Sequence, residues 1–196
     1  MVQAIGSLMT YGMNLILAAF GSAQTVFGIY FKLQSFVFMP VFGLNNGMVP
    51  IIAYNYGARH KDRVIRTIKH SVAYGVGIMC VGLIVMHIFP AQLMRMFDAE
   101  ESLIAIGVPA LEIISLSFVF AGFCIVVGSV FQALGNGVYS MIVSVARQMC
   151  VLLPVAKLLS LSGEVTLIWW AFPIAEGVCL ILALLLFRSA YRKRIA

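Results

Sequence analysis

Charged side chains are scarce in this sequence. Only 10% of its 196 residues are Asp, Glu, Lys or Arg, whereas 62% are apolar and the mean hydropathy is +1.04. A soluble domain normally carries about 25% charged residues. Apolar stretches of roughly 20 residues follow one another along the chain, and each is long enough to cross a hydrocarbon core of about 30 Å as a helix. The scarcity of charge therefore excludes an ordinary soluble fold and predicts an integral membrane protein.

The motifs of common enzyme and metal-binding classes are also missing. There is no GxSxG, no HExxH and no P-loop lysine motif, and the histidines at 60, 70 and 87 lack the spacing of metal ligands. The cysteines at 80, 124, 150 and 179 form no CxxC pair and lie in apolar surroundings. We expect them to be buried reduced thiols rather than a zinc site or a disulfide framework. The sequence thus predicts no enzyme, no bound metal and no other cofactor.

Positive charge is confined mostly to two short clusters beside apolar runs, although the net charge is +6. The first cluster contains Arg59, Lys61, Arg63, Arg66 and Lys69, and the second contains Arg188, Arg192, Lys193 and Arg194. Basic residues next to membrane segments contact anionic headgroups and are retained on the cytoplasmic side. We therefore expect membrane lipid, and no nucleic acid, as the partner of this charge.

Apolar runs separated by helix breakers predict an all-α fold with six transmembrane segments. Their expected ranges are near 4–21, 24–57, 64–89, 103–134, 138–160 and 164–188. At 1.5 Å per residue the second reaches about 50 Å, so it must tilt, protrude or bend, and Pro40 with Gly43 and Gly47 marks a place to bend. Prolines inside segments also free backbone carbonyl groups, as in the broken helices of transporters or in static kinks.

The loops predict the orientation of the chain in the membrane. Four segments separate the two basic clusters, and this even number allows both clusters to be cytoplasmic. The stretch from Arg95 to Glu101, with Asp98 and Glu100, and the later Glu164 then lie outside. Counting back places the amino terminus in the cytoplasm as well. We predict a multi-pass protein of the plasma (inner) membrane with both termini of this chain cytoplasmic.

Polar side chains inside the apolar segments are the candidates for a substrate or ion pathway, because lipid makes them costly unless they pair, face a cavity or snorkel. The candidates are Tyr11, Asn14, Lys32, Gln34, Glu112, Gln132, Arg147 and Glu176. Glu112 and Glu176 suit a proton or cation relay. An equally favoured alternative is an interhelical pair in which one of these two acids neutralises Arg147. Gln3 shares a broad face of the first segment with Tyr11 and Asn14. A polar stripe of this kind indicates a water-filled lumen or a contact between helices.

Three motifs are spread along nearly the whole chain. The first is GLNNGMVPIIAYNYGAR from Gly43 to Arg59, the second is FQALGNG from 131 to 137, and the third is SVARQ from 144 to 148, with a proline soon after. Together they resemble the carboxyl-terminal half of the multidrug and toxic compound extrusion (MATE) transporters, and the first resembles the end of the second helix of that half. The matching positions are Gly43, Pro50, Asn55, Gly57, Arg59, Gly135, Gln148 and Pro154.

The resemblance implies a twelve-helix antiporter with two six-helix lobes around a central cleft, which exchanges an inward flow of protons or sodium for an outward flow of small cationic or amphipathic compounds. Residues 1–196 would then form the carboxyl-terminal lobe, and the amino-terminal lobe, which this chain lacks, would be its partner. Some branches of the family carry a cation-binding acid in the first helix of this lobe, but there is none here between Gln3 and Gly21. If ion coupling depends on the other lobe, this chain holds mainly substrate wall and gate.

Two other functions stay open at this point. A flippase for a lipid-linked saccharide, from the same superfamily, would need a strongly basic cavity, for which only Lys32 and Arg147 are available. A non-transporting membrane remnant would merely assemble with other chains. The leading hypothesis is multidrug export by a half-transporter with alternating access, at a site lined by the first, second and fourth segments.

Overall fold

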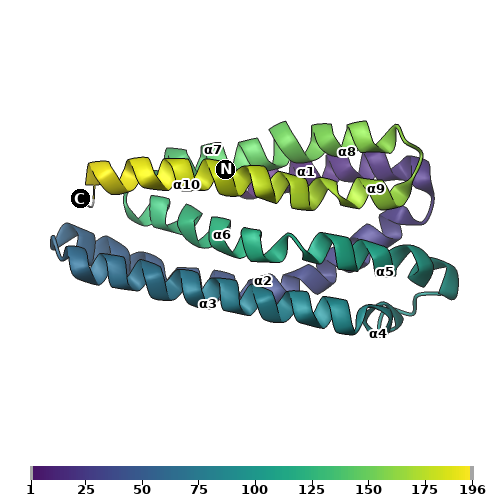
Figure 1. Ribbon diagram of the computed structural model, residues 1–196, viewed down its shortest axis with the longest axis horizontal. Helices are drawn as coiled ribbons and strands as arrows, with labels where there is room; N and C mark the ends of the chain where they lie inside the picture. The colour runs from purple at the N-terminus through teal and green to yellow at the C-terminus, as the bar shows by residue number, and fades with distance from the viewer. Residues whose placement is uncertain (1, 195–196) are drawn as a thin grey trace.

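The computed structural model describes residues 2–194, with side chains from residue 5 to residue 191. Figure 1 shows an elongated bundle whose helices run along one axis and reverse at short connections. In chain order the elements are α1 (Val2–Leu17), the 3-10 helix η1 (Ala18–Phe20), α2 (Ala23–Gly57), α3 (Lys61–Ile88), α4 (Pro90–Arg95), α5 (Glu101–Ser115), α6 (Phe118–Ala133), α7 (Gly137–Val145), the π-helix η2 (Ala146–Leu152), α8 (Leu153–Ser160), α9 (Val165–Trp169) and α10 (Ala171–Arg194).

Apolar helices occupy the six expected ranges. The fourth range is divided between α5 and α6, and the helix in the first range is shorter than the roughly 20 residues that a membrane span needs. Four stretches are long and apolar enough to cross a membrane, namely Ala23–Gly57, Lys61–Ile88, Gly137–Ser160 and Val165–Tyr191. A fifth crossing results if α5 and α6 count as one span, although they are bent by 48° at their break. The shorter apolar helix Ile5–Phe20 completes the set within the described residues.

The bend between α5 and α6 has a local chemical cause. Leu116 and Ser117 donate their backbone N–H groups to the carbonyl oxygens of Ile113 and Ile114, three residues back rather than four. Ser117 Oγ also donates to the Ile114 carbonyl at 2.6 Å. Bonds of this kind compete with the α-helical ladder and bend helices. The segment expected near 103–134 therefore consists of two helices, α5 and α6, with a bend between them.

The long second pass is not broken at its prolines. Pro40 and Pro50 both lie inside α2, which continues from Ala23 to Gly57. Its 35 residues span about 52 Å, well over the roughly 30 Å of a hydrocarbon core. The helix is not interrupted at Pro40, the place where a bend was expected. Beside α3, α2 extends along most of the bundle (Figure 1).

The fifth pass changes its helical register in the middle. Residues Ala146–Leu152 form a π-helix, and Pro154 follows it in the first turn of α8. Pro154 has no N–H to donate to the Cys150 carbonyl, so the α-helical bond at this point is lost. The π-helix is rare in proteins, and where single π-turns do occur they are often found at functional sites. Arg147 and Gln148 both belong to this turn.

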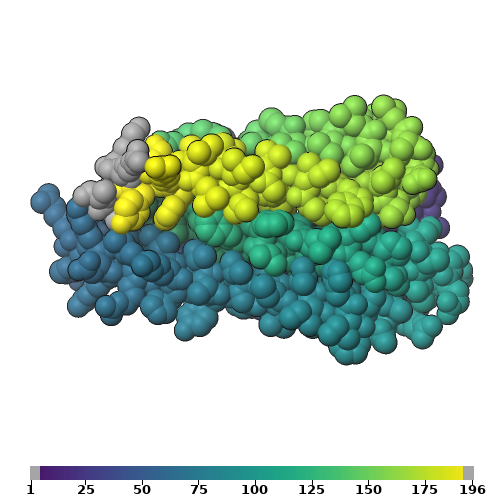
Figure 2. All heavy atoms as spheres, in the orientation of Figure 1, coloured from purple at the N-terminus to yellow at the C-terminus, as the bar shows by residue number. Residues whose placement is uncertain are grey.

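Close approach between helices holds the bundle together. A Cβ atom added at Gly122 of α6 would lie 2.8 Å from Met79 Cγ of α3, and one added at Gly82 of α3 would overlap Val37 of α2. Small residues at helix interfaces are the usual basis of packing within lipid, where the hydrophobic effect gives little attraction. On the face seen in Figure 2, α6 is visible only as a narrow band between α3 and α10.

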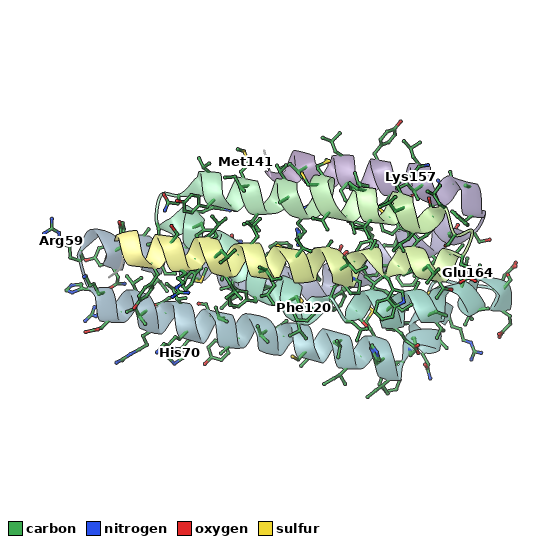
Figure 3. All side chains as sticks on the ribbon, turned by 45° about the horizontal axis from the view of Figure 1, so that its top comes forward. Arg59, His70, Phe120, Met141, Lys157 and Glu164 are labelled. Carbon is green, nitrogen blue, oxygen red and sulfur yellow. The ribbon has the colours of Figure 1, made fainter. Side chains whose placement is uncertain are left out.

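The two basic clusters lie at the same end of the bundle. The connection from α2 to α3, where Arg59 lies, and the carboxyl-terminal end of α10 are both at the left of Figure 1 (Figures 1 and 3). Figure 3 places Glu164 at the opposite end, where α4 also lies. The basic loop and the basic carboxyl-terminal region thus lie at one end of the bundle and the acidic loops at the other, as predicted. Which end faces the cytoplasm stays a prediction. α1 begins part-way along the bundle (Figure 1).

Candidate functional site

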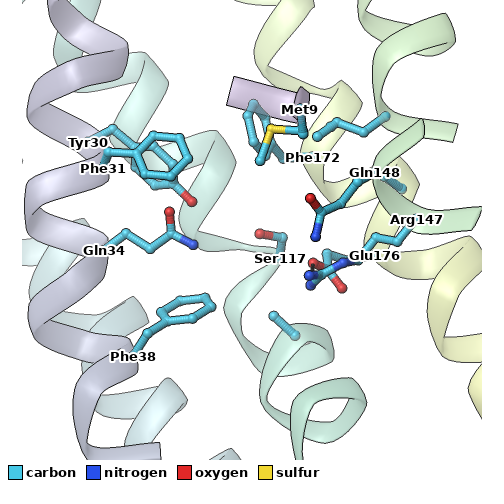
Figure 4. Close-up of a pocket in the computed structure, with 13 residues that line it drawn as sticks. Met9, Tyr30, Phe31, Gln34, Phe38, Ser117, Arg147, Gln148, Phe172 and Glu176 are labelled. Carbon is cyan, nitrogen blue, oxygen red and sulfur yellow. Dashed lines mark hydrogen bonds and ion pairs between the residues drawn. The ribbon is translucent and has the colours of Figure 1, made fainter. Parts of the chain in front are cut away.

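A small cavity lies where the bent and π-helical segments meet. Its volume is about 60 Å³, enough for a few water molecules or a small ion, whereas a drug-sized ligand needs about 300 to 1,000 Å³. The lining comes from α1, α2, the α5–α6 break, α6, η2 and α10 (Figure 4), and consists of Met9, Tyr30, Phe31, Gln34, Phe38, Ser117, Ala121, Arg147, Gln148, Leu152, Phe172, Ala175 and Glu176. The predicted first, second and fourth segments thus contribute, together with the fifth and sixth.

An ion pair joins two walls of this cavity. Arg147 Nη1 on η2 donates to Glu176 Oε1 on α10 at 2.8 Å. Their side chains are only 23% and 12% exposed. In such surroundings loss of one partner leaves an uncompensated charge, which typically costs about 3–5 kcal/mol. The interhelical pair considered from the sequence therefore exists between Arg147 and Glu176.

Three acceptor oxygens at the cavity have no protein donor among the described residues. They are Gln34 Oε1 on α2, Gln148 Oε1 on η2 and Glu176 Oε2 on α10. Figure 4 shows Gln34 pointing from α2 toward the Arg147–Glu176 pair on the other side. A buried acceptor without a donor costs about 1–3 kcal/mol. The arrangement therefore favours a small bound species that donates hydrogen bonds or carries positive charge.

The predicted residues of the first helix lie elsewhere. Tyr11 is 65% exposed, and the half-buried Asn14 donates its side-chain amide to the Thr10 carbonyl of its own helix at 2.9 Å. Neither lines the cavity. The Gln3 side chain lies outside the described residues. The expected polar stripe therefore does not face this cavity, because its described members point to the surface or bond within α1.

Three further candidates also lie away from the cavity. Lys32 is exposed, with Nζ 5.6 Å from the centre of the Phe97 ring, a distance that suits a cation–π contact. Glu112 is half-buried on α5 and is not part of the lining. Gln132 is exposed near the end of α6 and donates Nε2 to Ser140 Oγ at 3.0 Å. Of the eight predicted pathway residues, Gln34, Arg147 and Glu176 meet at the cavity.

Two polar residues of the lining, Tyr30 and Ser117, are not among the residues predicted from the sequence. Tyr30 could have been predicted from the sequence. Tyr30, Gln34 and Phe38 are spaced four residues apart, and residues at this spacing lie on one face of a helix. Ser117 could not, since it reaches the cavity through the break between α5 and α6, which hydropathy does not reveal.

Two of the family-motif positions, Gly135 and Arg59, terminate helices rather than line the cavity. Gly135 adopts φ 75° after α6, and the next residue, Asn136, bonds back into the helix at 2.7 Å. Arg59 adopts φ 59° after α2, and His60 N–H bonds to the Asn55 carbonyl at 2.9 Å. Both are helix C-caps of the left-handed type. Gln148 is the motif residue that lines the cavity, whereas Gly43, Pro50, Asn55 and Gly57 lie within α2 and Pro154 in α8.

The prediction that all four cysteines are buried is wrong for Cys150 and Cys80. Cys150 is exposed and Cys80 is half-buried, because the helical faces that carry them are turned outward. Cys124 on α6 and Cys179 on α10 are buried. These two thiols lie close to the Glu176 carboxylate, with one ligand atom from each residue within 4.8 Å of the others.

Sequence comparison gives matches among transport proteins. The profile of the MatE family matches residues 1–158. The multidrug export protein MepA of Staphylococcus haemolyticus is 30% identical over 177 residues, which cover 90% of this chain and 39% of that protein. MepA of Staphylococcus aureus strain N315 is 28% identical over 176 residues, covering 89% and 38%. This chain therefore spans about two fifths of the curated relatives that it matches.

Structure comparison gives matches of the same kind. The Vibrio cholerae MATE transporter VcmN in its bent form superposes with a TM-score of 0.91 at 20% identity, covering 98% of this chain and 44% of VcmN. The MATE multidrug transporter DinF-BH in complex with R6G gives a TM-score of 0.84 at 33% identity, covering 98% and 43%. In each case this chain corresponds to slightly less than half of the solved transporter.

Proposed function

This chain belongs to the MatE family and forms one six-helix half of the twelve-helix MATE fold, and on this premise we propose that it is the carboxyl-terminal half of a multidrug exporter. The resemblance to the MATE family is confirmed, as are the all-α membrane fold and the assignment to a transporter family rather than an enzyme family. The proposed substrates are small cationic or amphipathic compounds, moved by alternating access in exchange for protons or sodium.

The observation that carries this proposal is the convergence of Gln34, Gln148 and Glu176 on one cavity at the α5–α6 bend and the π-helix. At about 60 Å³ this cavity suits a coupling ion with its water and is too small for a drug. The substrate would then bind in the larger space between this lobe and an amino-terminal one. Broken helices with binding groups near the middle of the membrane are a common feature of transporters.

The Glu176 carboxylate can couple ion binding to helix movement. Its Oε1 holds Arg147, and its Oε2 has no protein donor among the described residues. A proton on Oε2 neutralises the carboxylate and weakens its attraction to Arg147, and a sodium ion on the same oxygen competes with that attraction. Either event loosens the link between η2 and α10. Binding can shift a conformational equilibrium only through such a differential contact.

The composition of the cavity argues against the flippase alternative. Its one cationic side chain among the described residues, Arg147, is already neutralised by Glu176 at 2.8 Å. Lys32 is exposed beside Phe97 and does not line the cavity. A lipid-linked saccharide phosphate would require several unpaired cations.

The half-transporter proposal can be tested by efflux of ethidium from cells at matched membrane levels of each protein. We expect no export by residues 1–196 alone, because alternating access needs a second bundle. Fusion of the amino-terminal lobe of a MATE transporter ahead of Met1 should restore it. Energy-dependent efflux by the chain alone, independent of host partners, would contradict the proposal and indicate a homodimer. A lack of export from every fusion would favour the non-transporting alternative.

The role of the carboxylate is tested in the same two-lobe protein. Glu176→Gln should abolish ion-driven export while leaving membrane insertion intact, because the amide cannot exchange a proton. Glu112→Gln is the matched control, since Glu112 is the other intramembrane acid and lies away from the cavity. If export and its pH or sodium dependence are unchanged in Glu176→Gln, coupling resides in the other lobe.

A further inference from the structure

Two thiols and one carboxylate come together beside the cavity that Glu176 lines. Cys124 Sγ, Cys179 Sγ and a Glu176 carboxylate oxygen all lie within 4.8 Å of one another. The three residues are 5%, 2% and 9% exposed. Glu176 and Cys179 are three residues apart and so share one face of α10, while Cys124 comes from the adjoining α6. We propose that these three side chains form a binding site for a thiophilic divalent cation of the zinc class.

The donor set and its spacing suit such an ion. Zinc binds Cys sulfur at about 2.3 Å and carboxylate oxygen at about 2.0–2.2 Å, which places ligand atoms roughly 3.5–3.8 Å apart in a tetrahedral site. The present spacing is within 4.8 Å, so closure onto an ion needs side-chain shifts of about 1 Å. Thiolate ligands select zinc and related soft cations over magnesium, calcium or sodium.

Charge balance makes the site tolerable inside a membrane. Without metal, Arg147 neutralises Glu176. A divalent ion displaces one proton from each thiol, so two positive charges arrive as two protons leave. The cluster of Arg147, Glu176, the two thiolates and the ion therefore has no net charge, which is the condition for burying ionised groups in an apolar interior.

The surroundings supply orientation and access. Arg147 holds Glu176 Oε1 at 2.8 Å and leaves Oε2 without a protein donor among the described residues. Outer partners of this kind fix a metal ligand in place and are a regular part of metal sites. Val127, Phe131 and Ala183 pack around the thiols in a separate apolar cluster. Glu176 also lines the cavity, so an ion can reach the site through it.

Binding and its consequence for transport are separate claims. Binding depends on the three ligands alone. Inhibition of export by zinc rests on the proposed function, because an ion on Glu176 would occupy the oxygen assigned to coupling. A failure of the export assay therefore leaves the binding measurement unaffected.

The test uses the purified 196-residue chain, kept reduced, with Cys80→Ser and Cys150→Ser so that the two site thiols alone remain. Titration with Cd²⁺ should show one ion per chain, thiolate-to-cadmium charge-transfer absorption and release of about two protons per ion. Cys124→Ser or Cys179→Ser should abolish the absorption of a two-thiolate site. Glu176→Gln should weaken binding roughly tenfold or more, while Glu112→Gln should leave it unchanged.

A second measurement needs no change at the site itself. X-ray absorption of the Zn²⁺-loaded Cys80→Ser/Cys150→Ser chain should show two sulfur neighbours at about 2.3 Å. A shell of oxygen and nitrogen only would overturn the proposal even if the site variants fail to fold. Absence of saturable Cd²⁺ binding, or binding that survives in both single serine variants, would also overturn it and leave the two thiols as small packing residues.

Discussion

Substitution of Arg147, Glu176 or both should measure how much their ion pair contributes to the free energy of unfolding. Unit charges 2.8 Å apart attract by about 6 kcal/mol at an effective dielectric constant of about 20, and this attraction offsets the cost of burying both. Arg147→Met or Glu176→Met alone leaves the other charge uncompensated, so each should destabilise the chain by about 3–5 kcal/mol. The double variant replaces the pair with apolar side chains and should be close to the original in stability.

The measurement is thermal unfolding in detergent, followed by tryptophan fluorescence, because Trp169 is fully buried next to Phe27 in the same bundle. Each single variant should lower Tm by roughly 10 °C, whereas the double variant should stay within about 3 °C of the original. Membrane proteins often unfold irreversibly, so all four proteins are compared at one scan rate. A double variant whose loss equals the sum of the single losses would refute the reasoning, because the two charges would then act independently.

Three other predictions follow from packing, backbone strain and topology. Gly82→Ala places a Cβ against Val37 and should cost about 1–3 kcal/mol of stability, whereas Gly77→Ala, with nothing within 4 Å of the added atom, should be neutral or slightly stabilising in the same Tm assay. Arg59→Gly relieves a left-handed φ of 59° and should stabilise by about 1 kcal/mol, or 2–4 °C in Tm; an unchanged or lower Tm would show that the strain is not real. A cysteine replacing Glu100 in a cysteine-free chain should react with impermeant reagents from outside the cell, and reaction from the cytoplasmic side would reverse the predicted topology.

Hydropathy and charge contain most of the information about the fold. The apolar runs gave the passes, and the two basic clusters do lie at one end of the bundle, as an even number of passes between them requires. The break in the fourth pass was not predictable in this way, since Ser117 forms a bond to its own backbone that leaves the average hydropathy unchanged. Pro109, by contrast, lies inside α5 without breaking it.

The site was predictable only in part, because position along a helix does not give direction around it. Glu112 and Glu176 looked alike in the sequence, as acids deep in apolar segments. In the structure Glu176 faces Arg147, whereas Glu112 does not line the cavity. The proximity of Cys124 to Cys179 depends on how α6 packs against α10. No local spacing pattern relates two residues so far apart in the chain.

The π-helix gives the fifth pass a property that the other passes lack within residues 2–194. A π-turn holds one residue more than the α-turn it replaces, so the chain here carries a surplus residue. Removal of one residue from an α-helix turns everything beyond it by about 100°, which would face the wrong side chains toward lipid. Removal of Met149 would instead convert η2 to α-helix and leave α8 facing its present neighbours. Such a deletion would separate the two roles of the segment, keeping the span but removing the widened turn that presents Arg147 and Gln148.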